Sequence, residues 1–165
     1  MMEEEKIRSG YIELTKKLIA RWETITTMES CTAGFIASLI TDAEGSSRAF
    51  KGSYIAYSTN IKIRCGVPKE IIEKYSVYSK ETAAAMAETC KKSFNADYGI
   101  GITGTTGNVD PENPTNSEPG KIYFAIATEE KTYSYAIEIK KASSRFEYKL
   151  KAAENILEKL NEIII

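Results

Sequence analysis

The sequence predicts an α/β domain with three layers, in which helices cover both faces of a mixed central sheet. Short β-branched or apolar runs, such as residues 24–28 and 98–102, alternate along the chain with stretches of helical periodicity. Two strands at residues 121–128 and 132–139 flank a tight Glu129-Glu130 turn and form a hairpin, which makes part of the sheet antiparallel. Such an alternation is typical of sheets with helices on both faces.

Composition bounds the kind of protein. The chain has 165 residues, which favours one domain over residues 1–165, and its net charge of −1 gives no electrostatic case for nucleic acid or an acidic membrane surface. No apolar run is long enough to span a bilayer, so we expect no membrane contact and a cytoplasmic location. The three cysteines are far apart and indicate neither a disulfide framework nor a zinc site. Histidine is absent, which excludes every Ser-His-Asp or Cys-His mechanism within the chain.

The first half of the chain alternates between helices and strands. Residues 3–22 carry an amphipathic helical stripe, residues 24–28 a buried strand, and a second helix follows from Phe35. A small polar loop at residues 42–47 either presents Ser46 and Ser47 to an anion or caps the next turn. Residues 53–57 form a short strand, and Ser58 or Thr59 then caps a turn of helix, after which Pro68 starts another short helix.

The second half of the chain also alternates between helices and strands. Ser79 caps an alanine-rich helix over residues 80–94. The strand at residues 98–102 contains glycines, which favour close approach by another backbone or by a ligand. A polar loop runs from residue 103 to residue 120, and loops of this length in a compact domain are usually functional or mobile. After the hairpin, Ser143 or Ser144 caps the last amphipathic helix.

Chemically useful side chains gather where the first strand turns into a helix. Ser30, Cys31 and Thr32 occupy this switch. A strand–helix turn holds a side chain at the carboxyl edge of the sheet and aims free backbone N–H groups at the same point, which suits a nucleophile or a phosphate cradle. Alternatively, the hydroxyl residues only cap the helix. Polar groups in residues 57–62 and 103–107 end two further strands and are expected to converge on the same edge.

Six segments carry more information together than singly. Residues 29–34 read E-S-C-T-A-G, residues 45–47 read G-S-S, and residues 57–62 read Y-S-T-N-I-K. Residues 103–107 read T-G-T-T-G, residues 120–123 read G-K-I-Y, and Arg145 follows. In this order they resemble the E-S-C-T-G-G, P-G-S-S, Y-S-N-x-x-K, T-G-x-A-G-P, G-T-V-Y and G-D-R elements of the CinA C-terminal domain family, the nicotinamide-nucleotide amidohydrolases. The resemblance covers about residues 6–162.

This resemblance implies hydrolysis of the carboxamide of nicotinamide mononucleotide to nicotinic acid mononucleotide and ammonia, without a metal or cofactor. Ser30 is then the nucleophile. Lys62 is the base, with a pKa lowered toward neutrality from about 10.4, and Tyr57 relays the proton or holds Lys62 in place. Backbone N–H groups of residues 31–33 form the oxyanion hole. The residues implied in substrate binding are Glu29, Cys31, Thr32, Ser46, Ser47, Asn60, Thr103, Gly104 and Arg145.

Several of these residues also have a plainer interpretation. Lys62 is otherwise a solvated surface lysine, Tyr57 a core aromatic, and Arg145 an ion-pair partner on a helix face. Cys31 is an alternative nucleophile, since a helix N-terminus lowers the pKa of a thiol. Glu29 contacts either the substrate or the turn.

The activity of the whole chain is open to more than one interpretation as well. The loop at residues 105–120 departs from the family pattern, with Glu118 where a basic residue is expected, and Lys149 replaces an expected arginine. A non-catalytic nucleotide-binding module and an amidase for a different small amide are therefore both kept beside the hydrolysis of nicotinamide mononucleotide. We expect a homo-oligomer, and a chain that is either a stand-alone version of the domain or a fragment of a two-domain protein.

Overall fold

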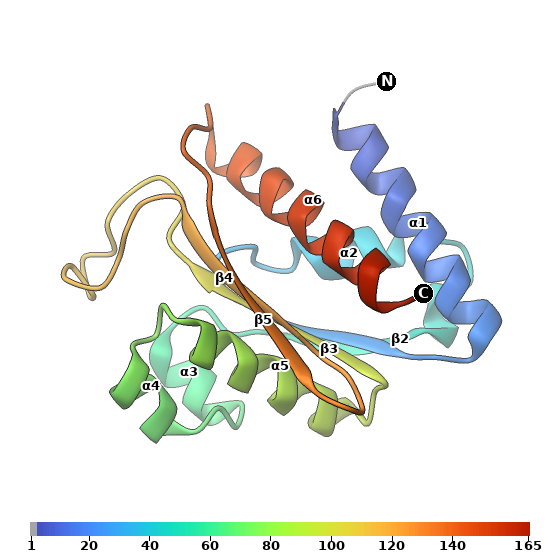
Figure 1. Cartoon of the computed structure of the whole chain (residues 1–165), viewed down its shortest axis with the longest axis horizontal. Helices are drawn as coiled ribbons and strands as arrows, with labels where there is room; N and C mark the ends of the chain where they lie inside the picture. Colours follow the sequence, from blue (N-terminus) through green and yellow to red (C-terminus); the bar gives the residue numbers. More distant parts are fainter. Residues whose placement is uncertain (1–2) are drawn as a thin grey trace.

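The computed structural model describes residues 3–165 and contains one five-stranded sheet in the order β2–β1–β3–β4–β5. Strands β2, β1 and β3 are parallel, whereas β4 and β5 run antiparallel to their neighbours. Helices α1, α2 and α6 cover one face and α3, α4 and α5 cover the other (Figure 1). The predicted three-layer α/β architecture is confirmed. The elements are α1 Glu3–Arg21, β1 Ile25–Glu29, α2 Phe35–Thr41, the 3-10 turn η1 Ser46–Arg48, β2 Phe50–Ile55, α3 Thr59–Arg64, α4 Lys69–Tyr75, α5 Lys80–Phe94, β3 Tyr98–Gly104, β4 Lys121–Ala127, β5 Thr132–Glu138 and α6 Arg145–Ile163.

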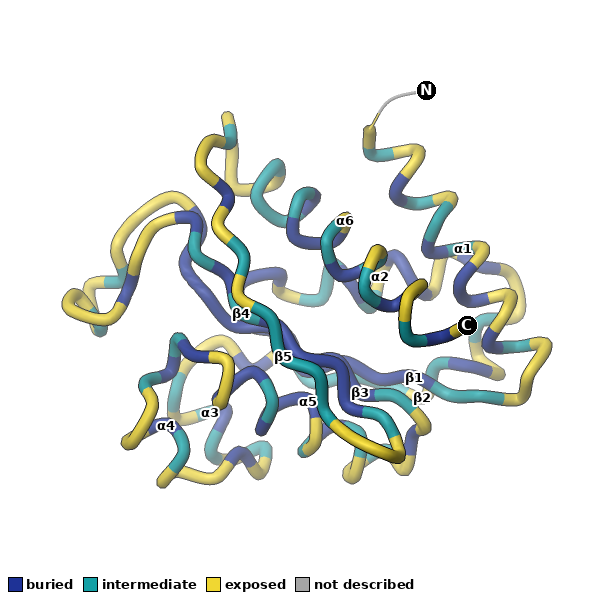
Figure 2. Tube along the Cα trace, viewed as in Figure 1, coloured by how far each residue is buried: buried dark blue, intermediate teal, exposed yellow. Residues whose placement is uncertain are grey.

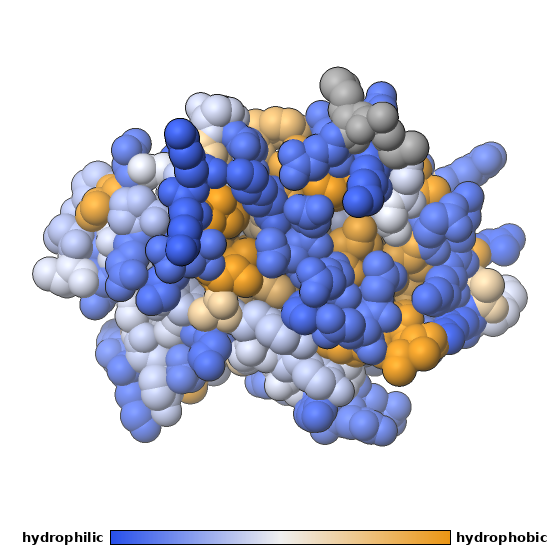
Figure 3. Space-filling model, turned by 45° about the horizontal axis from the view of Figure 1, so that its top comes forward, coloured by the Kyte–Doolittle hydropathy of each residue, from blue (hydrophilic) through white to orange (hydrophobic). Residues whose placement is uncertain are grey.

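Two of the three apolar clusters among residues 3–165 form most of the core, and the third is a small group of alanines on α5 and β4. The larger lies between the sheet and α1, α2 and α6, and includes the fully buried Tyr11, Ile100 and Ile156. The smaller lies under α3, α4 and α5 and includes Met28 and Met86. Strands β1 and β3 are buried along most of their length, while the loop before β4 is largely exposed (Figure 2). Polar residues cover most of the face in Figure 3, with hydrophobic residues in small patches.

Glycines in β3 let α5 pack directly on the sheet. A Cβ atom on Gly99 would lie 2.3 Å from the Ala87 carbonyl oxygen, and one on Gly101 would lie 2.2 Å from the Ala83 carbonyl oxygen. Both distances are far inside contact range, so any side chain would push the helix away. The close approach that these glycines predict is therefore made by the backbone of α5.

Strand β2 differs from its predicted range of residues 53–57. It begins at Phe50, which pairs with Ile25, and it ends at Ile55, which pairs with the last residue of β1. Tyr57 consequently lies beyond the strand, in the turn that leads into α3. Both ends of β2 are set by its pairing with β1, and the sequence of β2 alone does not reveal this pairing.

The predicted helix caps are confirmed in three places. The hydroxyls of Ser58, Ser79 and Ser144 accept hydrogen bonds from backbone N–H groups in the first turns of α3, α5 and α6. Pro68 differs slightly, because it precedes α4 as its N-cap residue and is not the first helical residue. Among residues 3–165, no helix combines the length and the apolar composition that crossing a bilayer requires.

Candidate active site

A serine and a buried lysine meet at the carboxyl edge of the parallel strands. Ser30 directly follows β1, and Lys62 projects from α3 beneath it. The Nζ atom of Lys62 lies 3.0 Å from the Ser30 Oγ atom and donates a second hydrogen bond of 3.1 Å to the carbonyl oxygen of Tyr57. The Lys62 side chain is only 1% exposed. The interpretation of Lys62 as a solvated surface lysine is therefore wrong.

Burial changes the proton affinity of Lys62. Desolvation lowers its pKa from 10.5 to about 8, and the negative charge of Asp110 opposes that shift only in part. At pH 7, one unit below this pKa, roughly one Lys62 side chain in ten is neutral. A neutral amine at hydrogen-bond distance from a hydroxyl can accept its proton, so the pair contains a nucleophile and a base.

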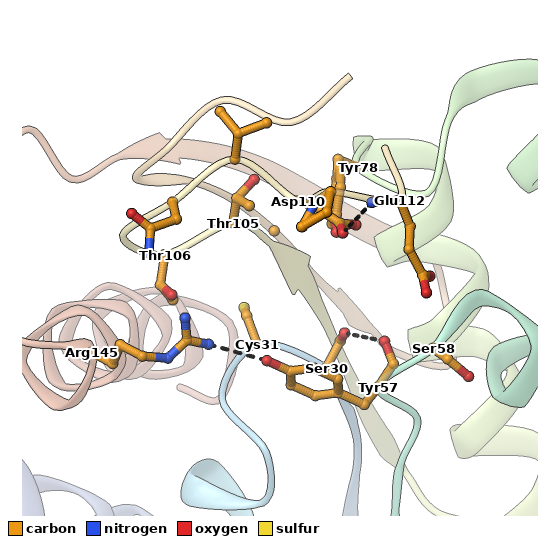
Figure 4. Close-up of a pocket in the computed structure, with 14 residues that line it drawn as sticks. Ser30, Cys31, Tyr57, Ser58, Tyr78, Thr105, Thr106, Asp110, Glu112 and Arg145 are labelled. Carbon is orange, nitrogen blue, oxygen red and sulfur yellow. Dashed lines mark hydrogen bonds between the residues drawn. The ribbon is translucent and has the colours of Figure 1, made fainter. Parts of the chain in front are cut away.

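Tyr57 contributes to this pair through its backbone. Its carbonyl oxygen accepts hydrogen bonds from Lys62 Nζ and, at 3.3 Å, from Ser30 Oγ. Its hydroxyl accepts a 3.1 Å hydrogen bond from Arg145 Nη2 (Figure 4). The ring is 59% exposed, so it is not a core aromatic. Within residues 3–165 the Tyr57 hydroxyl forms no hydrogen bond to Lys62 or Ser30, so the predicted relay is disfavoured, whereas the predicted holding of Lys62 is performed by the carbonyl group.

Glu29 fixes the turn that presents Ser30. Its fully buried carboxylate accepts hydrogen bonds of 2.7–2.9 Å from the hydroxyls of Thr27 and Thr32 and from the backbone N–H groups of Ile36 and Ala37. It thus takes up free N–H groups at the start of α2. Helix capping by the hydroxyl residues of the turn is a wrong interpretation, because α2 has no capping side chain at its N-cap residue. Substrate contacts through the side chains of Glu29 and Thr32 are also contradicted, since both side chains form hydrogen bonds within the turn.

Two backbone N–H groups beside Ser30 stay available. Within residues 3–165, the N–H groups of Cys31 and Thr32 donate no hydrogen bond to another residue. The N–H group of Ala33, in contrast, donates to the Ser30 carbonyl oxygen at 3.0 Å. An oxyanion hole at this turn would therefore use residues 31 and 32, and the prediction that includes Ala33 is wrong.

Cys31 does not have the character of a nucleophile. Its thiol is 5% exposed, and burial raises its pKa to about 12, although the neighbouring Lys62 lowers it in part. A thiol with this pKa is almost entirely protonated at neutral pH, whereas metal-free thiol nucleophiles react as thiolates. The possibility that Cys31 replaces Ser30 is therefore disfavoured, and Cys31 forms part of the wall beside Ser30.

A cavity of about 600 Å³ opens in front of Ser30. Cys31, Gly104 and Arg145 line it, as expected of binding residues (Figure 4). Arg145 is exposed at the start of α6 and forms no ion pair with a side chain among residues 3–165, so the interpretation as a helix-face ion pair is wrong. Sequence reasoning missed several wall residues, although the length of the polar loop had indicated the segment that carries most of them. These are Tyr78, Thr105, Thr106, Asp110 and Glu112.

Besides Glu29 and Thr32, four more predicted binding residues do not line this cavity. Ser46 and Ser47 lie before β2, at the amino edge of the parallel strands, whereas Ser30 lies at the carboxyl edge. Asn60 is exposed on α3 and contributes nothing to the cavity wall. Thr103 is fully buried, and its hydroxyl donates a 3.0 Å hydrogen bond to the Val77 carbonyl oxygen. Glu118 also points elsewhere, with its carboxylate 3.4 Å from Lys121 Nζ.

These features define a three-layer α/β domain with a serine–lysine pair at the carboxyl edge of its sheet. Comparison with known families gives a more specific result. The model of the CinA C-terminal domain matches residues 10–164, so the chain belongs to this family. The resemblance read from the sequence motifs is thereby confirmed.

Individual relatives agree with this assignment. The chain is 42% identical over 125 residues to a CinA-like protein of Flavobacterium psychrophilum. The aligned region covers 74% of this chain and 29% of that protein. A crystal structure of a competence-damaged protein (CinA) superfamily protein from Escherichia coli superposes with a TM-score of 0.87 at 26% identity, covering 99% of this chain and 93% of the other. One from Enterobacter cloacae gives 0.83 at 26% identity, with 94% and 92% covered. The chain spans less than a third of the length of the curated relatives that it matches.

Proposed function

We propose that the protein hydrolyses the carboxamide of nicotinamide mononucleotide to nicotinic acid mononucleotide and ammonia. The observation that carries this proposal is the 3.0 Å contact between Ser30 Oγ and the buried Lys62 Nζ. Amide hydrolysis needs a nucleophile, a group that moves protons and an oxyanion site. Ser30, Lys62 and the free N–H groups of Cys31 and Thr32 are suited to these roles without a metal ion. The nucleotide as substrate rests on the family resemblance.

In the proposed reaction, neutral Lys62 accepts the proton of the Ser30 hydroxyl while Oγ bonds to the carboxamide carbon. The oxyanion of the tetrahedral intermediate accepts hydrogen bonds from the N–H groups of Cys31 and Thr32. Protonated Lys62 then gives its proton to the departing nitrogen, which leaves as ammonia, and an ester on Ser30 remains. Water attacks this ester with Lys62 again as the base, and the carboxylic acid and free Ser30 result. Arg145 would hold the phosphate.

The test is ammonia release from nicotinamide mononucleotide by the purified protein in the presence of a chelator. Ser30→Ala should remove turnover, because it deletes the attacking oxygen. Ser38→Ala is the matched control, since Ser38 is an exposed serine on α2, and it should keep full activity. Absence of ammonia from the folded parent protein, or turnover that survives Ser30→Ala, would contradict the proposal.

An amidase that acts on a different small amide is the second candidate. It is favoured by the charges of the cavity wall, where Arg145 is the one basic residue among the lining side chains of residues 3–165 and already contacts the Tyr57 hydroxyl. A dianionic phosphate is usually met by more than one charged or N–H donor. A competition screen of small amides against nicotinamide mononucleotide distinguishes the two candidates.

A further inference from the structure

The cavity in front of Ser30 has an uneven distribution of charge. In Figure 4, Arg145 lies to the left of Ser30, whereas Asp110 lies above Ser30 and Glu112 above it and to the right. Among residues 3–165, no ion pair joins either carboxylate to a lysine or arginine side chain. The acidic side of the cavity therefore has no protein cation bound to it.

Asp110 is held in a fixed position on that side. Its carboxylate accepts hydrogen bonds from the Tyr78 hydroxyl, from Asn113 Nδ2 at 2.8 Å and from the Glu112 N–H group at 3.0 Å. Its own N–H group donates to Ser117 Oγ at 2.9 Å. The hydrogen bond from Tyr78 is the main reason that the pKa of Asp110 is lowered, so the group is an anion at neutral pH.

Thr105 lies in the same wall of the cavity. It is 8% exposed, yet its buried hydroxyl has no hydrogen-bond partner within the described part of the chain. Because the oxygen of this hydroxyl is itself buried, it does not contact the cavity, and the recognition proposed below depends on Asp110 and the cavity charges alone.

We propose that Asp110 is a specificity-determining residue that recognises positive charge on the ring that carries the carboxamide. The inference rests on the proposed function, in which the substrate is an N-substituted pyridinium with an anionic group at its far end. The ring charge would face the acidic side of the cavity, while Arg145 would take the anion. The ligand class is thus a cationic aromatic amide, and a neutral ring of the same shape should bind less well, because Asp110 is desolvated without gaining a counter-charge.

The test compares two ligands that differ in ring charge. Nicotinamide mononucleotide has a cationic pyridinium ring, and its 1,4-dihydro form has a neutral ring with the same carboxamide, ribose and phosphate. Binding is measured by calorimetry at pH 7 on the Ser30→Ala protein, so that turnover does not interfere. We expect the cationic form to bind about tenfold more tightly, as one close charge pair in a partly solvated cavity allows.

Adding Asp110→Asn should reduce this ratio to less than twofold, since asparagine keeps an acceptor oxygen for the Glu112 N–H group but removes the charge. Adding Glu118→Gln instead removes a charge from the same loop outside the cavity and should leave the ratio unchanged. Tyr78→Phe removes a hydrogen bond to Asp110 without changing its charge. It should weaken both ligands alike, which separates a shifted loop from lost charge recognition.

Equal affinity for the two ligands, an unchanged ratio in Asp110→Asn, or no binding of either ligand would overturn the inference. Failure of the proposed function is visible separately. A parent protein that releases no ammonia while its Ser30→Ala form distinguishes the two ring charges would refute hydrolysis and keep the recognition by Asp110. Ammonia release together with an unchanged ratio would refute the role of Asp110 alone.

Discussion

Replacing Lys62 with methionine should raise stability while it removes activity. Lys62 is 1% exposed, and its pKa falls from 10.5 to about 8. At about 1.4 kcal/mol for each pKa unit, burying the ammonium destabilises the folded state by about 3 kcal/mol. Methionine has similar length and no charge, but it removes the two hydrogen bonds that Lys62 donates to Ser30 Oγ and to the Tyr57 carbonyl oxygen, which costs about 1–2 kcal/mol. The variant should therefore be about 1–2 kcal/mol more stable at pH 7.

The pH dependence has a definite sign. Below pH 8 Lys62 is protonated in both folded and unfolded protein, so the destabilisation is complete there. Between pH 8 and 10.5 the unfolded chain still holds a proton that the folded chain has released, so the parent protein gains stability as pH rises. The advantage of Lys62→Met should therefore shrink steadily as pH rises, and by about pH 10 the variant should be no more stable than the parent, or slightly less stable. Turnover of the parent should rise through pH 8 to a plateau, because only the neutral amine accepts the Ser30 proton.

Urea unfolding at pH 7 and pH 10, with ammonia release measured across the same range, checks both parts. Loss of a general base lowers turnover by about 10²–10⁴-fold, and Lys62→Met should fall in that range or below it. Arg64→Met is the matched control, because Arg64 is exposed on the same helix, and it should change the free energy of unfolding by less than about 0.5 kcal/mol. Turnover within tenfold of the parent, or a variant less stable at pH 7 than the parent, would refute the reasoning.

Three further substitutions test the surroundings of the pair. Tyr57→Phe removes only the hydroxyl bonded to Arg145, so KM should rise while kcat stays within about fivefold; a hundredfold loss of kcat would restore the hydroxyl relay. Glu29→Gln places an amide N–H donor opposite groups that themselves donate hydrogen bonds to the Glu29 carboxylate. The free energy of unfolding, measured with urea, should fall by about 2–4 kcal/mol, and a fall of less than about 1 kcal/mol would contradict the role of Glu29 in fixing the turn. Ala33 has a φ of 49°, and Ala33→Gly should stabilise by about 0.5–1 kcal/mol, measured as a rise of about 1–3 °C in Tm; a fall in Tm would contradict the strain.

Local signals predicted the elements well where they were strong. Helix α5 has the predicted bounds, because Ser79 caps its start and an alanine-rich run favours helix up to Asn95. The bounds of β2 were wrong, since they depend on pairing with β1. The position of Ser46 and Ser47 follows from topology more than from motif. In a parallel βαβ unit the segment before the second strand lies at the amino edge, away from Ser30.

The site was partly predictable for a similar reason. Order and spacing of motifs brought Ser30 and Lys62 together, and the structure places them at hydrogen-bond distance. Which atom of Tyr57 serves the pair depends on a turn geometry that no local pattern records. The position of Glu29 under the start of α2, and that of Asp110 in its loop, depend on contacts between segments that meet only in the folded chain.

The two halves of the site come from separate parts of the chain. Ser30, the Tyr57 carbonyl and Lys62 all lie within the first 62 residues, in a single β1–α2–β2–α3 unit. The wall that faces them is contributed by later segments, from Tyr78 to Arg145. A sequence can therefore diverge in the later segments and acquire a new ligand preference while its reactive pair stays intact. The residues of the reactive pair and the residues that select the ligand can therefore change independently during evolution.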